Sequence, residues 1–316
     1  MKLNNDNLPQ TTVAGAFQNG KSTLINCLLD DQYAPMGKGT RTTACCSYFL
    51  FGEAEIATFV HGDTGKEEVL DRREDIFDPA FSCTGKDYLK ITCWKPLLQK
   101  VILVDTPGFD ANKEDDEAAR NAVRKSEIVI FVHDTRQLDE SARQILKTIQ
   151  REGKHLLFLM NCKDDLHWHP SDEKNMHLAG VLENQLQEMG LDDSLLRING
   201  RRVWNCNPVF AWYALGHLQR DLDHKDEGIQ KDADDMIEKI HHFCKKQCKK
   251  DPTWMDKNQK DLLLSASGIL DIRRCIENAA ATILTNVCLN PSGEVRILTD
   301  KWASQLQAMF RQIERK

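Results

Sequence analysis

The chain has 316 residues, of which 41% are hydrophobic and 28% are charged, and its formal net charge is −6. This size suits one large α/β domain with a helical appendage, and the acidic balance gives no basic footprint, so we expect no nucleic-acid partner. The longest apolar runs are of strand length, far short of a bilayer span, and the first residues lack the apolar core of a secretory signal. The odd number of cysteines, 11, fits buried reduced thiols better than a disulfide framework, which favours a cytoplasmic location.

A phosphate-binding motif lies near the start of the chain. The string GAFQNGKS at residues 15–22 falls between a strand expected at residues 10–14 and a helix expected at residues 20–30. It is a complete G-x-x-x-x-G-K-[ST] motif in strand–loop–helix context, which indicates a P-loop. The glycines let the backbone wrap around an anion, Lys21 reaches the terminal phosphates and Ser22 can bind Mg²⁺. The predicted nucleotide contacts here are Gly15, Gln18, Asn19, Gly20, Lys21, Ser22 and Thr23.

A polar, glycine-rich stretch at residues 36–43 precedes a β-like run at residues 44–51. A magnesium–nucleotide site needs a second hydroxyl that reaches the metal only when the terminal phosphate is present, and a threonine just before a strand can supply it. Thr43 is the first choice for this catalytic and metal-binding role, and Thr40 is the second. The alternative is that these threonines only start the strand.

Residues 53–87 contain more chain than a compact P-loop domain needs between its motifs. Residues 56–60 suggest a strand in a hairpin with the preceding run, and residues 66–80 suggest a short charged helix and loop. A compact small GTPase would reach its next motif much sooner, so we expect an insertion near residues 53–87. A further strand at residues 88–94 then pairs before residues 101–104 enter the centre of the sheet.

The buried strand at residues 101–104 leads into Asp105-Thr106-Pro107-Gly108. A carboxylate at this strand end can hold the outer shell of Mg²⁺, and Gly108 can present its N–H to the γ-phosphate. Phe109 comes next, where small GTPases commonly carry a water-orienting glutamine. The attacking water must then be positioned by another group, either Gln18 or a group or monovalent cation supplied when two nucleotide-binding faces meet. Gln18 as a solvent-facing loop residue is equally open.

Strand and helix patterns alternate from residue 112 onward. Helices are expected at residues 112–125 and 141–150, and strands at residues 128–132 and 156–160. Such alternation predicts an α/β fold, a three-layer P-loop sandwich with a mostly parallel sheet and ligands at the carboxyl ends of the strands.

The strand at residues 156–160 runs into Asn161-Cys162-Lys163-Asp164-Asp165, where a guanine-reading N/T-K-x-D motif is expected. One register keeps Asn161 and Asp164, and the other keeps Lys163 and Asp165. We favour the second because it preserves both charged groups: the lysine stem stacks along the base, and the aspartate accepts from two guanine N–H groups that adenine lacks. A loop of surface charges is the alternative.

The sequence after residue 171 predicts a charged helix at 171–189, a final strand at 202–207, a mainly helical insertion at 208–262 and a closing helix at 265–284. Asn207 lies where backbone N–H groups meet the guanine O6, although a plain strand end explains it equally well. His241, His242, Cys244 and Cys248 suggest a metal site only weakly, because a buried apolar stripe explains the same spacing, and His167, His169 and His177 carry no more weight.

The pattern divides the chain into a GTPase domain at residues 1–290 and an amphipathic helix at residues 291–316. That helix places apolar side chains on one side, and we expect it to pack against another helix. The partner helix is open between the same chain, a second copy and another protein, with the same chain favoured. The apolar side consists of Val295, Leu298, Trp302, Leu306, Met309 and Ile313.

Residues 13–26, 42–44, 105–109 and 162–165 together resemble dynamin-like large GTPases, especially the bacterial ones, within the TRAFAC class of P-loop GTPases. The resemblance spans about residues 10–285. It implies a Mg²⁺-dependent GTPase that dimerises across its nucleotide faces, hydrolyses GTP faster when assembled, and often works peripherally at membranes. The fourth motif departs from the family pattern, and one terminal helix leaves no room for the long stalk and membrane-binding tip.

Two other functions fit the same motifs. One is an Era-like GTPase with insertions. The other is a nucleotide-binding scaffold or switch that barely turns over, for which Phe109 is the best support.

Overall fold

The computed structural model describes residues 5–34, 45–70, 86–109, 113–162, 170–221, 227–251, 253 and 258–288. Several predicted features lie outside these ranges: Thr40, Thr43, Lys163, Asp164, Asp165 and the helix at residues 291–316.

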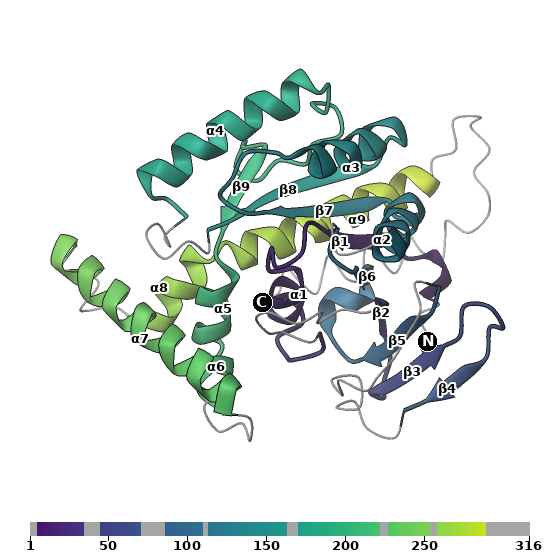
Figure 1. Cartoon of the computed structure of the whole chain (residues 1–316), viewed down its shortest axis with the longest axis horizontal. Coiled ribbons are helices and arrows are strands. Elements are labelled where there is room, and N and C mark those ends of the chain that lie inside the picture. Colours follow the sequence, from purple (N-terminus) through teal and green to yellow (C-terminus); the bar gives the residue numbers. More distant parts are fainter. Residues whose placement is uncertain are drawn as a thin grey trace.

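The described residues form one nine-stranded sheet in the order β4-β3-β5-β2-β6-β1-β7-β8-β9 (Figure 1). The five strands from β6 to β9 in this order are parallel, whereas β2 is antiparallel to β6. All six residues of β7 are buried, as expected for a central strand covered on both faces. The strands are β1 (Gln10–Ala14), β2 (Cys46–Phe51), β3 (Ile56–Val60), β4 (Glu67–Val69), β5 (Tyr88–Cys93), β6 (Ile102–Asp105), β7 (Ile128–His133), β8 (His155–Asn161) and β9 (Val203–Cys206).

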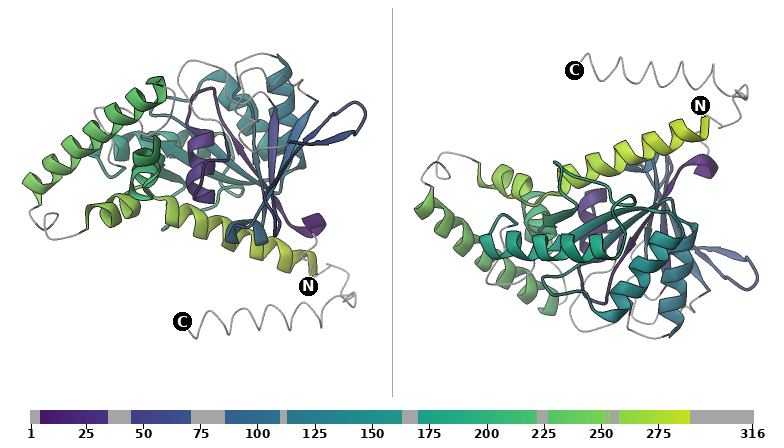
Figure 2. Two further views of the ribbon diagram at one scale, coloured as in Figure 1. Left: turned by 90° about the horizontal axis from the view of Figure 1, so that it is seen from below. Right: turned by 90° about the horizontal axis from the view of Figure 1, so that it is seen from above.

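Helices cover both faces of the sheet, which gives the predicted three-layer α/β sandwich (Figure 2). One core cluster joins the sheet to α1, α5 and α9, and a second joins it to α2, α3 and α4. Helix α3 illustrates the sequence logic: Asp139 caps it by accepting from the Ala142 N–H at 2.8 Å, and Ile145 and Ile149 follow at helical spacing on its buried side. The helices are α1 (Lys21–Leu29), α2 (Lys113–Lys125), α3 (Glu140–Arg151), α4 (Glu173–Glu188), α5 (Pro208–Ala214), α6 (His217–Asp221), α7 (Glu227–Lys250), α8 (Gln259–Ala266) and α9 (Ile269–Cys288).

The predicted hairpin between residues 44–51 and 56–60 is wrong, because β5 lies between the two strands. Cys46 of β2 pairs in parallel with Tyr88 of β5, and Ile56 of β3 pairs antiparallel with Thr92 of β5. The hairpin of this region is instead β3–β4, closed by a turn in which Gly65 adopts φ +68°. The charged helix expected from residue 66 therefore begins as a strand. Alternate side chains of β5 are buried, so this strand gains more by packing between β2 and β3 than at an edge.

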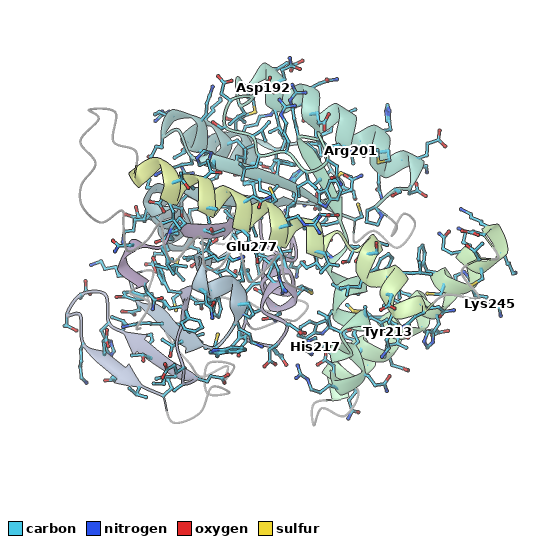
Figure 3. All side chains as sticks on the ribbon, turned by 180° about the vertical axis from the view of Figure 1, so that it is seen from behind. Asp192, Arg201, Tyr213, His217, Lys245 and Glu277 are labelled. Carbon is cyan, nitrogen blue, oxygen red and sulfur yellow. The ribbon has the colours of Figure 1, made fainter. Side chains whose placement is uncertain are left out.

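The helical insertion expected at residues 208–262 forms α5 to α7 and the start of α8, which ends at Ala266, and α7 and α8 extend to one side of the sandwich (Figure 1). Figure 3 labels Tyr213 and His217 near the root of this helical arm and Lys245 on α7. Ile237, Ile240 and Cys244 of α7 are buried, which confirms the apolar stripe. No group of three or more His, Cys, Asp or Glu in the described ranges could hold a metal ion. None of the helices that the structure describes is both long and apolar enough to cross a bilayer.

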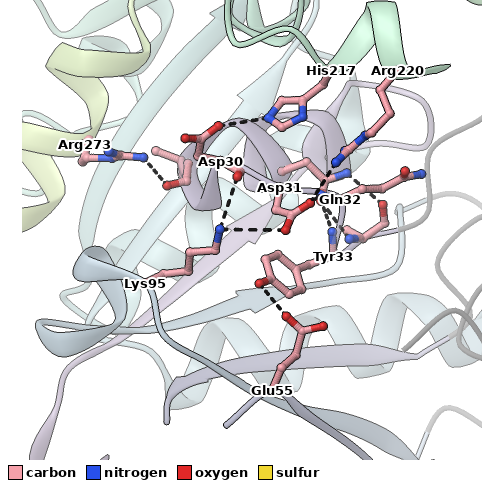
Figure 4. A network of polar contacts seen from close by, with 12 residues as sticks. Asp30, Asp31, Gln32, Tyr33, Glu55, Lys95, His217, Arg220 and Arg273 are labelled. Carbon is pink, nitrogen blue, oxygen red and sulfur yellow. Dashed lines mark hydrogen bonds and ion pairs between the residues drawn. The ribbon is translucent and has the colours of Figure 1, made fainter. Parts of the chain in front are cut away.

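The C-terminal end of α1 is joined to α6, to α9 and to the segment that follows β5 (Figure 4). Asp30 ends α1 with φ 51°, and its carboxylate lies 2.9 Å from Nε2 of His217 on α6. Its carbonyl accepts from Lys95 Nζ at 3.2 Å, and the Leu28 carbonyl accepts from Arg273 of α9. Helix α1 is therefore fixed at the end remote from the P-loop.

The cysteines whose side chains are described are free thiols, and most of them are buried. Burial raises the pKa of Cys162 to about 12 and that of Cys244 to about 11, so both remain protonated at neutral pH.

Phe131 of β7 is 1% exposed. Its ring packs between those of Phe109 and Phe158, with centroid distances of 6.5 and 5.6 Å. We expect Phe131→Ala to lower the free energy of unfolding by about 3–5 kcal/mol, because it leaves a cavity in this stack. Urea denaturation measures the loss. The matched control is Trp94→Ala, since Trp94 is 63% exposed and its truncation should change stability by about 0.5 kcal/mol or less. Equal losses in the two variants would contradict the assignment of Phe131 to the core.

Candidate nucleotide-binding site

The candidate site lies at the carboxyl ends of the parallel strands β6, β1, β7 and β8, where the loop at residues 15–20 joins β1 to α1. The end of β6 contributes the segment Asp105–Phe109, and β8 contributes Asn161. Predicted motifs that are far apart in sequence therefore meet at one edge of the sheet, as expected for a parallel α/β fold.

The loop conformation requires glycine at two positions. Gly15 has φ +153°, and a Cβ there would lie 2.2 Å from the carbonyl oxygen of Val132. Gly20 has φ +85°, and a Cβ there would lie 2.4 Å from Nδ2 of Asn161. Lys21 is 6% exposed and its Nζ donates to the Ala16 carbonyl at 3.0 Å, which folds the ammonium group back over the loop. This arrangement of cation and glycines suits a bound anion.

Ser22 and Asp105 lie together as predicted for the metal site. The Ser22 hydroxyl donates to Oδ2 of Asp105 at 2.9 Å, and Asp105 is fully buried. Both side chains offer oxygen ligands, which Mg²⁺ prefers. The two residues therefore fit a magnesium ion, and Thr43, the third predicted ligand, lies outside the described residues.

The segment after Asp105 runs alongside the P-loop. The Phe109 N–H donates to the Gly15 carbonyl at 3.3 Å, and the Phe17 N–H donates to the Phe109 carbonyl at 3.2 Å. A Cβ on Gly108 would lie 2.6 Å from Cα of Phe17. Gly108 is thus adjacent to the loop, as its predicted role requires, and Phe109 is 2% exposed in the aromatic stack. The Phe109 side chain therefore supports the loop and cannot orient water.

The side chain of Asn19 is buried and holds the P-loop in place. Its Nδ2 donates to the Val132 carbonyl at 3.2 Å, and the backbone carbonyl of Asn19 accepts from Nδ2 of Asn161 at 2.9 Å. Sequence reasoning missed this role of Asn161, although an asparagine at the end of a buried strand was a usable signal. Gln18 is exposed with φ 62°, so it lies on the outer surface of the loop. Direct contacts of Gln18 and Asn19 with a nucleotide stay predictions.

Asn207 connects the guanine-motif segment to the helical insertion. Its Nδ2 donates to the Cys162 carbonyl at 3.0 Å, and its Oδ1 accepts from the Val209 N–H at 3.1 Å, which caps α5. Its backbone N–H donates to the Ser267 carbonyl at 3.0 Å. These contacts fix the end of β9, and the predicted contact of this segment with guanine stays a prediction.

A small recess lies beside the P-loop. It includes residues from the connection between β7 and α3, which sequence reasoning did not single out. In that connection Nε and Nη2 of Arg136 lie 2.7 and 2.6 Å from Oδ2 of Asp134. Burial lowers the pKa of His133, while the charge of Asp134 and the Arg136 carbonyl act in the opposite direction. The lining consists of Ala16, Asn19, Phe109, Phe131, His133, Arg136, Asp139 and Ala142.

Residues 12–163 match the model of the Dynamin family. The chain is 26% identical over 186 residues to a probable transmembrane GTPase FZO-like of Arabidopsis thaliana chloroplasts, covering 58% of this chain and 18% of the relative. It is 26% identical over 162 residues to Dynamin-like protein 2 of Campylobacter jejuni, covering 49% of this chain and 26% of the relative.

Among solved structures, an oligomerised bacterial dynamin pair is similar with a TM-score of 0.47 and 17% identity, over 76% of this chain and 38% of that one. The chain therefore spans well under two thirds of the length of each of these proteins.

Gly108→Ala tests the close approach of the two loops. The added methyl group would push the Gly108 segment away from Phe17, and we expect nucleotide binding to weaken by about 1–3 kcal/mol, roughly 5- to 150-fold. Titration with a fluorescent guanine nucleotide measures the change. The control is Gly180→Ala on α4, where a Cβ meets nothing within 4 Å and alanine favours the helix. Unchanged affinity in Gly108→Ala would contradict the site.

His133 predicts a pH dependence of stability. Its ordinary pKa is 6.5, and burial lowers the pKa in the folded chain. As the pH falls below about 6.5, the unfolded chain takes up the proton first, so the free energy of unfolding falls by up to about 1.4 kcal/mol per pH unit. Urea denaturation between about pH 7.5 and 5.5 should show a smaller fall for His133→Gln, whose amide can still donate to the Arg136 carbonyl. Identical pH profiles would refute the assignment.

Proposed function

We propose that this chain, whose residues 12–163 belong to the dynamin family of GTPases, binds GTP and hydrolyses it to GDP and phosphate. The observation that carries the proposal is the meeting of three motifs at one edge of the sheet: the P-loop with Lys21, the Ser22–Asp105 pair and Gly108. Each is a part that phosphoryl transfer to water needs.

In this function Lys21 and the N–H groups at residues 15–20 bind and orient the phosphates. Ser22, Asp105 and Thr43 would hold Mg²⁺, which when bound neutralises charge on the β- and γ-phosphates. Gly108 donates its N–H to the γ-phosphate, and burial of Phe109 against the P-loop keeps Gly108 at contact distance.

Base selection is assigned to the segment after β8. Lys163 packs along the guanine and Asp165 accepts from its N1–H and exocyclic amine. The backbone N–H groups next to Asn207 face O6. Support comes from two hydrogen bonds that position this segment. Asn161 donates to the backbone carbonyl of Asn19 in the P-loop, and Asn207, at the end of β9, donates to the carbonyl of Cys162.

We infer further that GTP turnover rises when two copies meet across their nucleotide faces, with a monovalent cation as a candidate cofactor at that interface. The support is the family relationship together with the absence of a polar side chain at Phe109. Peripheral contact with a membrane or a protein partner, and a cytoplasmic location, belong to the same proposal.

The second candidate function is a nucleotide-binding scaffold or switch with little hydrolysis. The burial of Phe109 favours it, because that position cannot orient water. An Era-like GTPase with insertions differs from the main proposal only in lacking assembly-stimulated turnover.

The test is steady-state phosphate release from GTP over a range of protein concentrations. We expect hydrolysis by the wild type, with the rate per molecule rising as concentration rises, and loss of hydrolysis in Lys21→Ala. Lys147→Ala is the matched control, since Lys147 is exposed on α3 away from the P-loop. Tight GTP binding without phosphate release at any concentration would support the scaffold instead.

The same assay with xanthosine triphosphate tests the base assignment. Asp165→Asn should lose GTP activity and gain activity with the xanthosine nucleotide, because an amide pairs with xanthine. Asp164→Asn is the control, and a switch of preference in that variant would assign the register that keeps Asn161 and Asp164.

A further inference from the structure

Among the residues that the structure describes, Lys21 is the cationic group assigned so far to the hydrolytic site. Stabilising the charge that develops on the γ-phosphate calls for a cationic group beyond Lys21, and GTPases that supply an arginine for this purpose gain about 10³- to 10⁵-fold in rate. Phe109 supplies no polar atom, because its side chain lies in the core beside Phe131. The connection between β7 and α3 supplies a cation close by.

Arg136 lines the recess beside the P-loop together with Ala16 and Phe109. The carbonyl of Ala16 accepts from Lys21 Nζ at 3.0 Å. Lys21 is the group that reaches the terminal phosphates. Arg136 therefore lines a recess that shares Ala16 with the phosphate-binding lysine.

The backbone of Arg136 is fixed while its guanidinium is exposed. The Arg136 N–H donates to Oδ1 of Asp134 at 3.1 Å, and the Arg136 carbonyl lies 3.0 Å from Nε2 of His133. The Asp134 side chain is 9% exposed and that of Arg136 is 70% exposed. Asp134 therefore holds the backbone N–H and one edge of the guanidinium, while most of the Arg136 side chain remains exposed.

The guanidinium has to leave Asp134 to reach a phosphate. This breaks contacts of 2.7 and 2.6 Å to a buried carboxylate, which keeps the hydrogen bond from the Arg136 N–H. A triphosphate offers several charged oxygens, and a guanidinium can bind two of them at once. Contact with the γ-phosphate offsets the loss of the Asp134 pair.

We propose that Arg136 is a catalytic residue that contacts the γ-phosphate of GTP bound by the same chain and stabilises its charge during hydrolysis. This inference rests on the proposed function. In the reaction the water oxygen forms a bond to the γ-phosphorus, and the bond from phosphorus to the β–γ bridging oxygen breaks. GDP leaves with that electron pair, and a water proton passes to the released phosphate. Arg136 keeps its protons throughout and acts by charge and hydrogen bonding.

The test compares single-turnover GTP hydrolysis, GDP affinity and the affinity for GDP–aluminium fluoride in four proteins: wild type, Arg136→Ala, Arg136→Lys and Arg151→Ala. Arg151 is exposed at the far end of α3 and is the matched control. We expect Arg136→Ala to hydrolyse GTP about 10³-fold more slowly, with unchanged GDP affinity and loss of the aluminium fluoride complex. Arg136→Lys should recover only part of the rate, because an ammonium group cannot bind two oxygens in a planar fork. Arg151→Ala should match the wild type.

Three results would overturn the proposal. The first is hydrolysis by Arg136→Ala at the wild-type rate. The second is a fall in GDP affinity equal to the fall in rate, which would make Arg136 a structural support of the loop. The third is recovery of activity when Arg136→Ala is mixed with Lys21→Ala, which would place the arginine on the nucleotide of a second copy. If the wild type binds GTP and releases no phosphate, the proposed function itself fails, so the two failures are distinguishable.

Discussion

The backbone of Val132 packs so closely against Gly15 that a Cβ on Gly15 would lie 2.2 Å from the Val132 carbonyl oxygen. On the other side of the same loop, the Phe109 N–H donates to the Gly15 carbonyl. The P-loop is thus held between the end of β7 and the segment that follows β6, and its path depends on both contacts. A loop held in this way is formed before any anion arrives, so phosphate binding does not have to fix the backbone.

The core beneath the loop maintains this spacing. Phe109, Phe131 and Phe158 form one aromatic stack that links the segment after β6 to β7 and β8. The amide of Asn19 adds a polar contact to Val132, and Asn161 reaches the loop from β8. Because β7 ends at His133 and leads into Asp134 and Arg136, the strand that shapes the loop also brings Arg136 to the recess beside it.

Helix α1 extends from this loop to the helical insertion. Its last turn contacts α6 through Asp30 and His217, and its Leu28 carbonyl accepts from Arg273 of α9. The ring of His217 stacks on Trp212 of α5 at 4.1 Å. Figure 3 also shows Glu277 on α9, which pairs with Lys100 at 2.8 Å beside the sheet. The nucleotide site and the arm are therefore attached to opposite ends of one short helix.

Several features of this protein follow from local sequence. The P-loop motif is recognised from the spacing of a few neighbouring residues, with a strand before it and a helix after it. The structure contains all three. The apolar periodicity of residues 113–161 likewise specifies alternating helices and parallel strands. The Ser22–Asp105 contact was predictable because the carboxyl ends of parallel strands share an edge.

Other features depended on tertiary packing. The order of β2, β5 and β3 was decided by which strand buries its alternating side chains best, a comparison between segments about 40 residues apart that local pattern does not contain. Phe109 follows Gly108, which contacts the P-loop. Only the packing of its ring against Phe131 shows that this side chain supports the loop. Arg136 lies in a charged turn like many others, and only the folding of β7 against β1 brings it to the P-loop. Sequence by itself determined which chemical groups this protein carries for phosphate, since motif spacing is local. The tertiary structure decided which of the remaining side chains stand near them, because that proximity is produced by long-range packing.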